Sequence, residues 1–180
     1  LIVNNPYIEP TKYWLYNRED RSFELKNGRR NSGYWKKSDQ KLDESDPGEF
    51  IEIELVNRIR PRVKKWREEN YPNVTPTTKR LLDFWRDKKQ REQNQNPFFC
   101  QMEAVETAIW LTEAIESEKQ GIKIPSDGNW LRECFKLATG TGKTVVMSML
   151  ITWHVLNKLS NPKDPRYSKF PVKDITTVDM

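Results

Sequence analysis

Eight residues from Leu137 to Thr144, LATGTGKT, carry the groups that grip a polyphosphate. Gly140 and Gly142 allow a tight turn in which successive backbone N–H groups point inward at phosphate oxygens. Lys143 adds a positive charge for the β- and γ-phosphates, and the Thr144 hydroxyl can ligate Mg²⁺. The helix that starts here directs its positive dipole end at the same place. The sequence therefore predicts a site for ATP with Mg²⁺, formed by Thr139, Gly140, Thr141, Gly142, Lys143 and Thr144.

The flanking residues place this loop between a strand and a helix. The run Cys134–Ala138 is short and mostly apolar, as in a buried parallel strand, and Val145–Leu159 is apolar nearly all round. A strand, a glycine-rich loop and a buried helix open a P-loop NTPase fold. One position departs from the pattern G-x-x-x-x-G-K-[ST], which has glycine where this chain has Leu137. The alternative is a glycine-rich turn that happens to precede Lys143, and the flanking elements favour the phosphate loop.

A second nucleotide contact is predicted in the segment Phe98–Gln101, near the start of another helix. A glutamine amide has one acceptor and two donors, so Gln101 can match the donor and acceptor edge of adenine. The ring of Phe99, just ahead of it, can stack on the base. The alternative is that Phe98 or Phe99 packs in the core and that Gln101 is a surface residue. The phosphate loop further along the chain favours adenine contacts by Gln101 and Phe99.

The composition fits one domain, or a small region joined to part of another. The 180 residues are 36% hydrophobic and 32% charged, which is polar for a globular domain, but 11% aromatic, which is too much for a disordered chain. The two cysteines, Cys100 and Cys134, indicate no disulfide framework and no zinc site, so we expect a reducing, cytoplasmic setting. No apolar run is long enough to span a membrane. Because the first residue is not methionine, we expect a fragment at its front end.

The net charge of +5 is unevenly distributed, with twelve basic and four acidic residues between Arg58 and Arg91. This local excess could bind the phosphate backbone of double-stranded DNA. The alternative, which the sequence does not separate from the first, is a solvated helical face rich in Arg and Lys. The predicted DNA contacts are Arg58, Arg60, Arg62, Lys64 and Lys65.

Proline, glycine and charge divide the chain into three parts. Residues 1–48 are extended and loop-rich, with a short strand at Lys12–Tyr16 and an acidic, polar linker at 38–48. Residues 49–96 form a mainly helical accessory region. Residues 97–180 carry both nucleotide elements.

Hydrophobic periodicity predicts the helices of the second and third parts. Phe50–Asn70 has apolar residues on one face, and Pro61 is expected to kink this helix. Thr75 and Pro76 are typical of an N-cap followed by proline at the first helical position. A longer helix is expected from Pro97 to about Ser117. The buried side of the helix after Pro76 is predicted at Leu81, Leu82 and Trp85.

Taken together, these motifs resemble the ATPase subunit of type III restriction enzymes, a DEAD/DEAH-like helicase of superfamily 2. The likeness is carried by the phosphate loop and by the Gln101 element, which in that superfamily is called the Q motif. Other stretches that fit the subfamily are Asn5–Pro10 with Trp14, Gly28–Arg30, Leu55–Arg60, Thr78–Leu82 with Trp85, and Glu103 with Ala104.

The resemblance implies an α/β fold, in which residues 97–180 are the truncated start of the first helicase motor lobe. This would be an incomplete, RecA-like P-loop NTPase lobe, preceded by the helical accessory region. It also implies a motor that uses ATP to move along or remodel double-stranded DNA, coupled to an endonuclease and to a methyltransferase (modification) subunit of a restriction system. Carried over by residue, Gln101 would read adenine, Gly140 and Gly142 would shape the loop, Lys143 would hold phosphates and Thr144 the Mg²⁺.

Parts that such a motor needs for turnover are not found in the sequence. No Asp-Glu pair of the Walker B type follows the phosphate-loop helix, and there is no second motor lobe and no nuclease carboxylate cluster. Hydrolysis needs a carboxylate near Mg²⁺ and a positioned water. We therefore expect a truncated piece that neither hydrolyses ATP nor folds its C-terminal third well. Two alternatives stay open: a standalone nucleotide- or nucleic-acid-binding module, and a non-functional truncated gene product.

Overall fold

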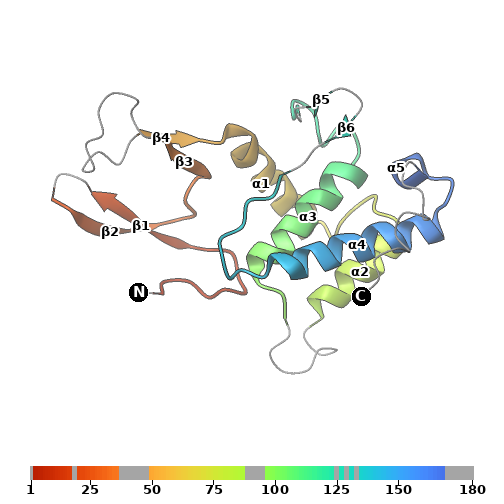
Figure 1. Cartoon of the computed structure of the whole chain (residues 1–180), viewed down its shortest axis with the longest axis horizontal. Coiled ribbons are helices and arrows are strands. Elements are labelled where there is room, and N and C mark those ends of the chain that lie inside the picture. The colour runs from red at the N-terminus through yellow and green to blue at the C-terminus, as the bar shows by residue number, and fades with distance from the viewer. Residues whose placement is uncertain are drawn as a thin grey trace.

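The computed structural model describes residues 2–17, 20–36, 49–87, 96–123, 126–127, 130–131 and 134–168, so the expected linker at 38–48 lies outside it. The described chain is a mixed α/β protein in which two-stranded antiparallel sheets lie beside a group of packed helices (Figure 1). In chain order the elements are β1 (Lys12–Asn17), β2 (Ser22–Asn27), β3 (Gly33–Lys36), β4 (Glu49–Glu52), α1 (Glu54–Glu68), α2 (Pro76–Arg86), α3 (Phe99–Glu113), β5 (Ser126–Asp127), β6 (Trp130–Leu131), α4 (Lys143–Ser160) and α5 (Pro165–Ser168).

Aromatic residues at alternate positions form the N-terminal hairpin. β1 pairs antiparallel with β2, so that Trp14 lies opposite Leu25 and Tyr16 opposite Phe23. The ring centroids of Tyr16 and Phe23 are 5.0 Å apart. The strand predicted at 12–16 is therefore confirmed. This hairpin and the β3–β4 pair project to one side of the helices (Figure 1).

The first helix begins later than its predicted start at Phe50. Residues Glu49–Glu52 form β4, in which Phe50 lies opposite Trp35 of β3 and their rings meet edge to face at 5.3 Å. The sequence pattern missed this because a pairing between distant strands leaves no mark on helical periodicity. α1 then runs from Glu54 to Glu68 and continues through Pro61.

Local signals predicted α2 correctly. The Thr75 hydroxyl accepts a hydrogen bond from the Thr78 N–H at 3.1 Å, and Pro76 takes the first helical position. The predicted inner side is confirmed, since Leu82 and Trp85 are buried and one further leucine is partly buried against the core.

The third helix is the centre of the helical group and packs against α1 and α4. It ends at Glu113 and not near Ser117, because Ala114 adopts an extended backbone with ψ 148°. Val105, Ile109 and Trp110 on α3 are completely buried. A helix covered on several sides shows little contrast between its faces, so its sequence marks its ends poorly.

A buried glutamate on α3, Glu106, holds three neighbours together. Its carboxylate accepts hydrogen bonds from Arg67 Nε and from the Tyr71 hydroxyl, each at 2.7 Å, and it also pairs with Arg86. Burial, together with the charge of Glu106, raises the pKa of Tyr71. Because buried charges are stable only when paired, this cluster fixes α1 and α2 against α3.

A second buried glutamate, Glu113, is one of the anchors of α4. Its oxygens accept hydrogen bonds from Thr75 N at 2.7 Å, Thr78 Oγ1 at 2.5 Å, Trp153 Nε1 at 2.9 Å and the Tyr167 hydroxyl. All four donors are uncharged groups, and Glu113 is only 3% exposed. The network joins α2, α3, α4 and α5 and so fixes the helix that begins at the phosphate loop.

The run before the phosphate loop, Cys134–Ala138, is not a strand, and the prediction of a buried parallel strand is wrong for the described structure. Its exposure alternates, with Phe135 and Leu137 partly buried against the core. All the described sheets are antiparallel pairs of other segments, so this run has no parallel neighbour among the described residues. A strand exists only when a second strand accepts and donates its backbone hydrogen bonds.

The helix after the loop, α4, buries only part of its surface. Val146, Met149 and Trp153 lie in the core, whereas Met147 and Ile151 are 60% and 55% exposed. The predicted helix is confirmed, with a start at Lys143 in place of Val145, but the prediction that it is buried is correct for one side only.

Candidate nucleotide site

The phosphate loop turns tightly at its two glycines. Gly140 has φ +79° and Gly142 has φ +72°, in the left-handed region that favours glycine. Three donors converge on the Ala138 carbonyl: Thr141 N at 3.4 Å, Thr141 Oγ1 at 2.7 Å and Lys143 Nζ at 3.1 Å. The Lys143 ammonium group therefore lies folded over the loop, held by a main-chain oxygen.

Helix α4 begins at this loop with open backbone donors. Gly142 is its N-cap, and no side chain caps the helix. Val145 N and Val146 N both donate to Gly142 O, at 3.0 and 3.3 Å. The N–H groups of Lys143 and Thr144 have no acceptor among the described residues. Such open donors at a helix N-terminus attract an anion. The side chains of Thr139 and Thr144 are exposed beside them.

Gln101 links the second predicted element to the phosphate loop. Its Oε1 accepts from Phe98 N at 2.8 Å, and its Nε2 donates to Thr141 O at 2.8 Å. The side chain is 5% exposed, so the alternative that Gln101 is a surface residue is wrong. Gly142 permits this approach, because a Cβ built on it would lie 2.3 Å from Gln101 Nε2. Two motifs far apart in the sequence thus meet at one place.

The aromatic residues beside Gln101 contact other side chains of the protein. The guanidinium groups of Arg29 and Arg67 both lie over the Phe99 ring, 5.4 and 5.3 Å from its centroid. The neighbouring Phe98 ring contacts Tyr7, with centroids 5.5 Å apart, and Tyr7 is 44% exposed. Adenine contact by Phe99 stays a prediction, and Tyr7 is an exposed aromatic residue that the local pattern around Gln101 did not reveal.

Arg29, which the sequence named only as part of the stretch Gly28–Arg30, also lies at this site. Its guanidinium group binds the Glu103 carboxylate in a two-pronged pair at 2.6 and 2.5 Å, and it lies 3.5 Å from Glu9. Burial acts to lower the pKa of Arg29, but the bonds to Glu103 raise it overall. This pair fixes the N-terminal segment to α3, two residues from Gln101. The partners are far apart in the chain, so no local signal could have found them.

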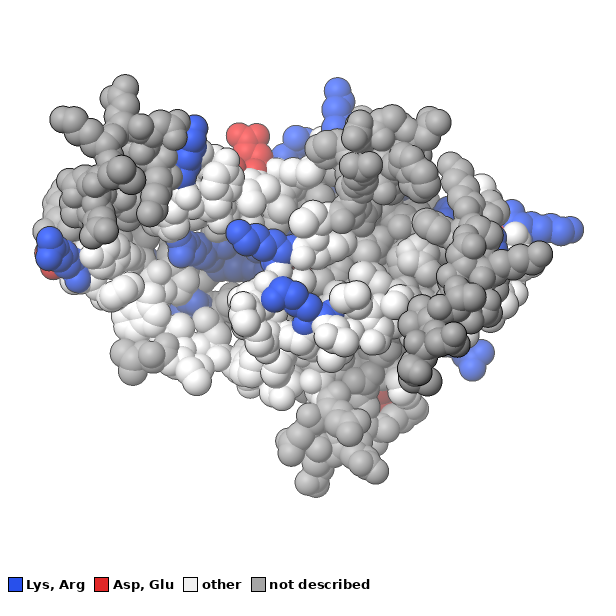
Figure 2. Space-filling view, in the orientation of Figure 1, with Lys and Arg blue, Asp and Glu red and all other residues white. Residues whose placement is uncertain are grey.

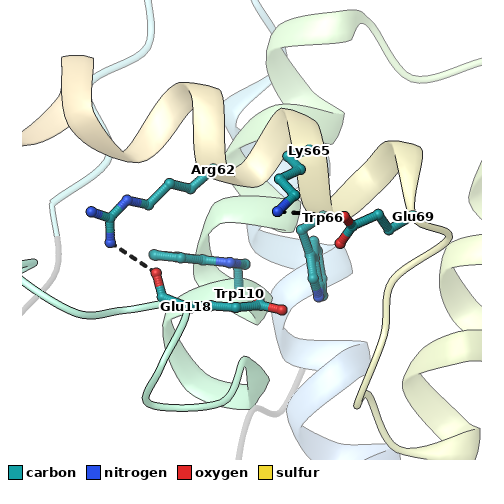
Figure 3. A pocket seen from close by; sticks show the side chains of 6 residues that line it. All are labelled: Arg62, Lys65, Trp66, Glu69, Trp110 and Glu118. Atoms are coloured by element: carbon teal, nitrogen blue, oxygen red, sulfur yellow. Dashed lines mark hydrogen bonds and ion pairs between the residues drawn. The ribbon is translucent and has the colours of Figure 1, made fainter.

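The five basic residues predicted to contact DNA divide between two sides of α1. On one side, arginines hold the turn that follows α3. Arg58 Nη2 donates to Gly121 O at 2.7 Å. Arg62 Nη1 donates to Glu118 O at 2.8 Å and to Gln120 O at 2.7 Å. Figure 3 shows Arg62 reaching Glu118. These two arginines therefore have a structural task.

The two lysines of this set form ion pairs. Lys65 lies 3.6 Å from Glu69 on the same side as Arg62 (Figure 3), and Lys64 lies 2.9 Å from Glu9 on the other side. Their side chains are 76% and 50% exposed. Ion pairs this open to water are weak.

Arg60 lies on the same side of α1 as Lys64 and is half-buried. Its Nη1 donates to the Arg30 carbonyl at 3.3 Å. The face in Figure 2 shows Lys and Arg near the junction of the hairpins with the helices. Since each of the five residues already bonds to the protein and they do not share one face, DNA contact by this set stays a prediction.

Two buried tryptophans beside Arg62 differ in their indole nitrogens (Figure 3). Trp66 Nε1 donates to Pro72 O at 3.0 Å, whereas Trp110 Nε1 is buried and has no acceptor among the described residues. We expect Trp66→Phe to lower the free energy of unfolding by about 1–2 kcal/mol more than Trp110→Phe, because only the first change breaks a hydrogen bond. Urea unfolding of both variants measures this difference.

The comparison carries its own control, since both changes remove the same atoms from rings that are almost wholly buried. The loss of packing is therefore similar in the two variants, and the difference reports on the indole N–H. A Trp110→Phe variant that is at least as destabilised as Trp66→Phe would contradict the prediction.

No helix in the described part of the chain is apolar over a length that would cross a bilayer. In the same residues, no group of three His, Cys, Asp or Glu side chains is placed to hold a metal ion. Compared with known proteins, the chain matches no family model, no curated protein and no solved structure.

Proposed function

We propose that the loop at 137–144 binds the phosphates of ATP with Mg²⁺, as in the superfamily 2 ATPases that the sequence resembles. The observation that carries this proposal is the hydrogen bond from Gln101 Nε2 to Thr141 O. Gln101 and the loop were predicted separately as contacts to the two ends of one nucleotide, and this bond joins them. A glycine-rich turn with no ligand gives no reason for that meeting.

The groups at the loop fit a polyphosphate. The open N–H groups of Lys143 and Thr144 would donate to phosphate oxygens, and the dipole of α4 would add to their attraction. Lys143 would exchange its bond to the Ala138 carbonyl for a stronger one to a charged phosphate. The exposed Thr144 hydroxyl would ligate a Mg²⁺ ion held mainly by the phosphates.

The base would lie at the Gln101 end of the site. The Oε1 atom of Gln101 is engaged with Phe98 N, and Nε2 carries a second hydrogen besides the one given to Thr141. The base would meet that hydrogen and stack on Tyr7, which is exposed and backed by Phe98. Phe99 would support the site indirectly, through its contacts with the guanidinium groups of Arg29 and Arg67.

In its wider role, the chain would be the ATP- and DNA-binding N-terminal part of a helicase or translocase like that of type III restriction enzymes. It would work in the cytoplasm with a methyltransferase subunit and an endonuclease, and alone it would bind ATP without hydrolysing it. Double-stranded DNA would contact Lys65, whose side chain is 76% exposed and whose ion pair with Glu69 is open to water. A standalone nucleotide-binding module is the second candidate, and the local geometry of the loop supports it equally.

Substitution of Lys143 tests the site. We expect Lys143→Ala to weaken ATP binding in Mg²⁺ by about 10- to 100-fold, because it removes one charge-assisted hydrogen bond to phosphate. Isothermal titration of the full chain with ATP measures the affinity, and omission of Mg²⁺ should weaken binding to the wild type as well.

A matched control is Lys163→Ala, which removes an exposed lysine from the turn beyond the other end of α4. This variant should bind ATP like the wild type. Equal affinities of the wild type and Lys143→Ala would remove the proposal, as would equal losses in the two lysine variants.

A further inference from the structure

A cavity lies beside the phosphate loop and shares Leu137, Ala138 and Thr141 with it, but neither Lys143 nor Thr144. It encloses about 600 Å³ between α1, α3 and the run Cys134–Ala138, and it ends at Thr141. Its volume is within the range of ligand-binding cavities in proteins. Most of its wall is apolar, formed by Ile53, Val56, Ile59, Ala104, Leu111 and Phe135.

One wall of this cavity is backbone without hydrogen bonds. From Cys134 to Leu137, the N–H and C=O groups have no partner among the described residues. Exposure alternates along the run, with Phe135 and Leu137 turned toward the core and Lys136 outward. Alternating exposure together with unpaired backbone groups is what the edge of a sheet presents to an incoming strand.

The cavity wall also contains an arginine, Arg60, that has more hydrogen-bond donors than partners among the described residues. Arg60 lines the wall and is half-buried, and its one hydrogen bond is the 3.3 Å contact with the Arg30 carbonyl. A guanidinium group has five N–H donors. Arg29 lines the same wall, but its Nη1 and Nη2 atoms both donate to the Glu103 carboxylate. An acidic group in the cavity would therefore find its partner in Arg60.

We propose that this cavity receives an extended strand of another polypeptide. The strand pairs with the backbone of residues 134–137, places apolar side chains at alternate positions into the cavity and presents a carboxylate to Arg60. The unpaired backbone selects a strand over a compact ligand, because only a strand satisfies a row of N–H and C=O groups at once. This docking does not depend on the proposed ATP site.

Synthetic peptides test the backbone pairing. The probes are capped heptapeptides with valine, isoleucine or leucine at alternate positions, threonine between them and aspartate at one end. They are titrated against the full chain without nucleotide, and hydrogen exchange follows the amides of Phe135 and Leu137. We expect unprotected amides in the chain alone, protection on peptide binding, and at least about tenfold weaker binding when alternate peptide amides are N-methylated.

Arg60→Gln tests the charge. This change should weaken binding of the aspartate peptide about tenfold and leave binding of the same peptide with asparagine in place of aspartate unchanged. Arg80→Gln, at an exposed position on α2, is the control and should bind both peptides like the wild type. Equal losses for both peptides in Arg60→Gln would contradict the contact with a carboxylate.

Other occupants give different results. Binding of decanoate but of no peptide would make the cavity a site for small apolar anions and overturn the proposal. Protection of the 134–137 amides that grows with protein concentration would assign the cavity to a second copy of the chain, and this too would overturn the proposal. Amides that are already protected in the dilute chain, or N-methylated peptides that bind equally well, would show that the edge is not open.

Discussion

Glu113→Ala is expected to lower the free energy of unfolding by at least about 3 kcal/mol, a large part of the 5–15 kcal/mol by which a domain of this kind is stable. The substitution removes the acceptor for Thr75 N, Trp153 Nε1 and two hydroxyl groups, all of them in the core. Each buried donor that loses its partner costs about 1–3 kcal/mol. Hydroxyl groups can turn to other acceptors, and the Trp153 indole keeps Thr78 Oγ1 at 3.0 Å, but the backbone N–H of Thr75 has no second acceptor among the described residues.

Urea unfolding, followed by far-ultraviolet circular dichroism, measures the change. The control is Glu116→Ala, three residues further along, where the side chain is 91% exposed and forms one open ion pair with Lys119. We expect that variant to stay within about 0.5 kcal/mol of the wild type. Similar unfolding midpoints for both variants would mean that Glu113 does not hold α4 in place.

Elements that depend on near neighbours could be predicted from the sequence. Thr75 and Pro76 marked the start of α2, because capping and proline geometry involve only the first turn of a helix. Trp85 was predicted on the buried side by periodicity, and it is 6% exposed. The β1 strand was also found, because its aromatic residues favour an extended chain.

Elements that depend on distant partners could not be predicted. Phe50 looked like the first residue of a helix, and only its pairing with Trp35 makes it part of β4. The two buried glutamates of α3 give no local sign of burial, because a charged residue in a helix normally faces water. Glu106 is buried because Arg67 and Arg86 approach it from other helices.

The candidate site shows the same division. The turn at the two glycines and the start of α4 followed from the motif, since both are properties of eight consecutive residues. The contact between Gln101 and Thr141, the role of Arg29 over Phe99 and the exposure of Tyr7 depend on how separate segments pack. Periodicity and composition contain no information on such contacts.

The most specific consequence of this packing concerns Gly142. Gly142→Ala is expected to lower the free energy of unfolding by about 2–4 kcal/mol and to weaken ATP binding at least as much as Lys143→Ala. The alanine would have to keep the backbone φ of +72°, and its Cβ would lie 2.3 Å from Gln101 Nε2. Gln101 would have to move, which breaks its bond to Thr141 O and frees the loop from α3.

Gly140→Ala separates the effect of the left-handed backbone from the effect of the clash with Gln101. Gly140 has nearly the same backbone, with φ +79°, but nothing lies within 4 Å of a Cβ built on it. In this variant the free energy of unfolding should fall by only about 1 kcal/mol, the cost of a left-handed backbone for alanine. The variant should keep most of its affinity for ATP. Urea unfolding and ATP titration of both variants make the comparison. If the two alanine variants lose stability and affinity equally, the contact between Gln101 and the loop does not shape the site.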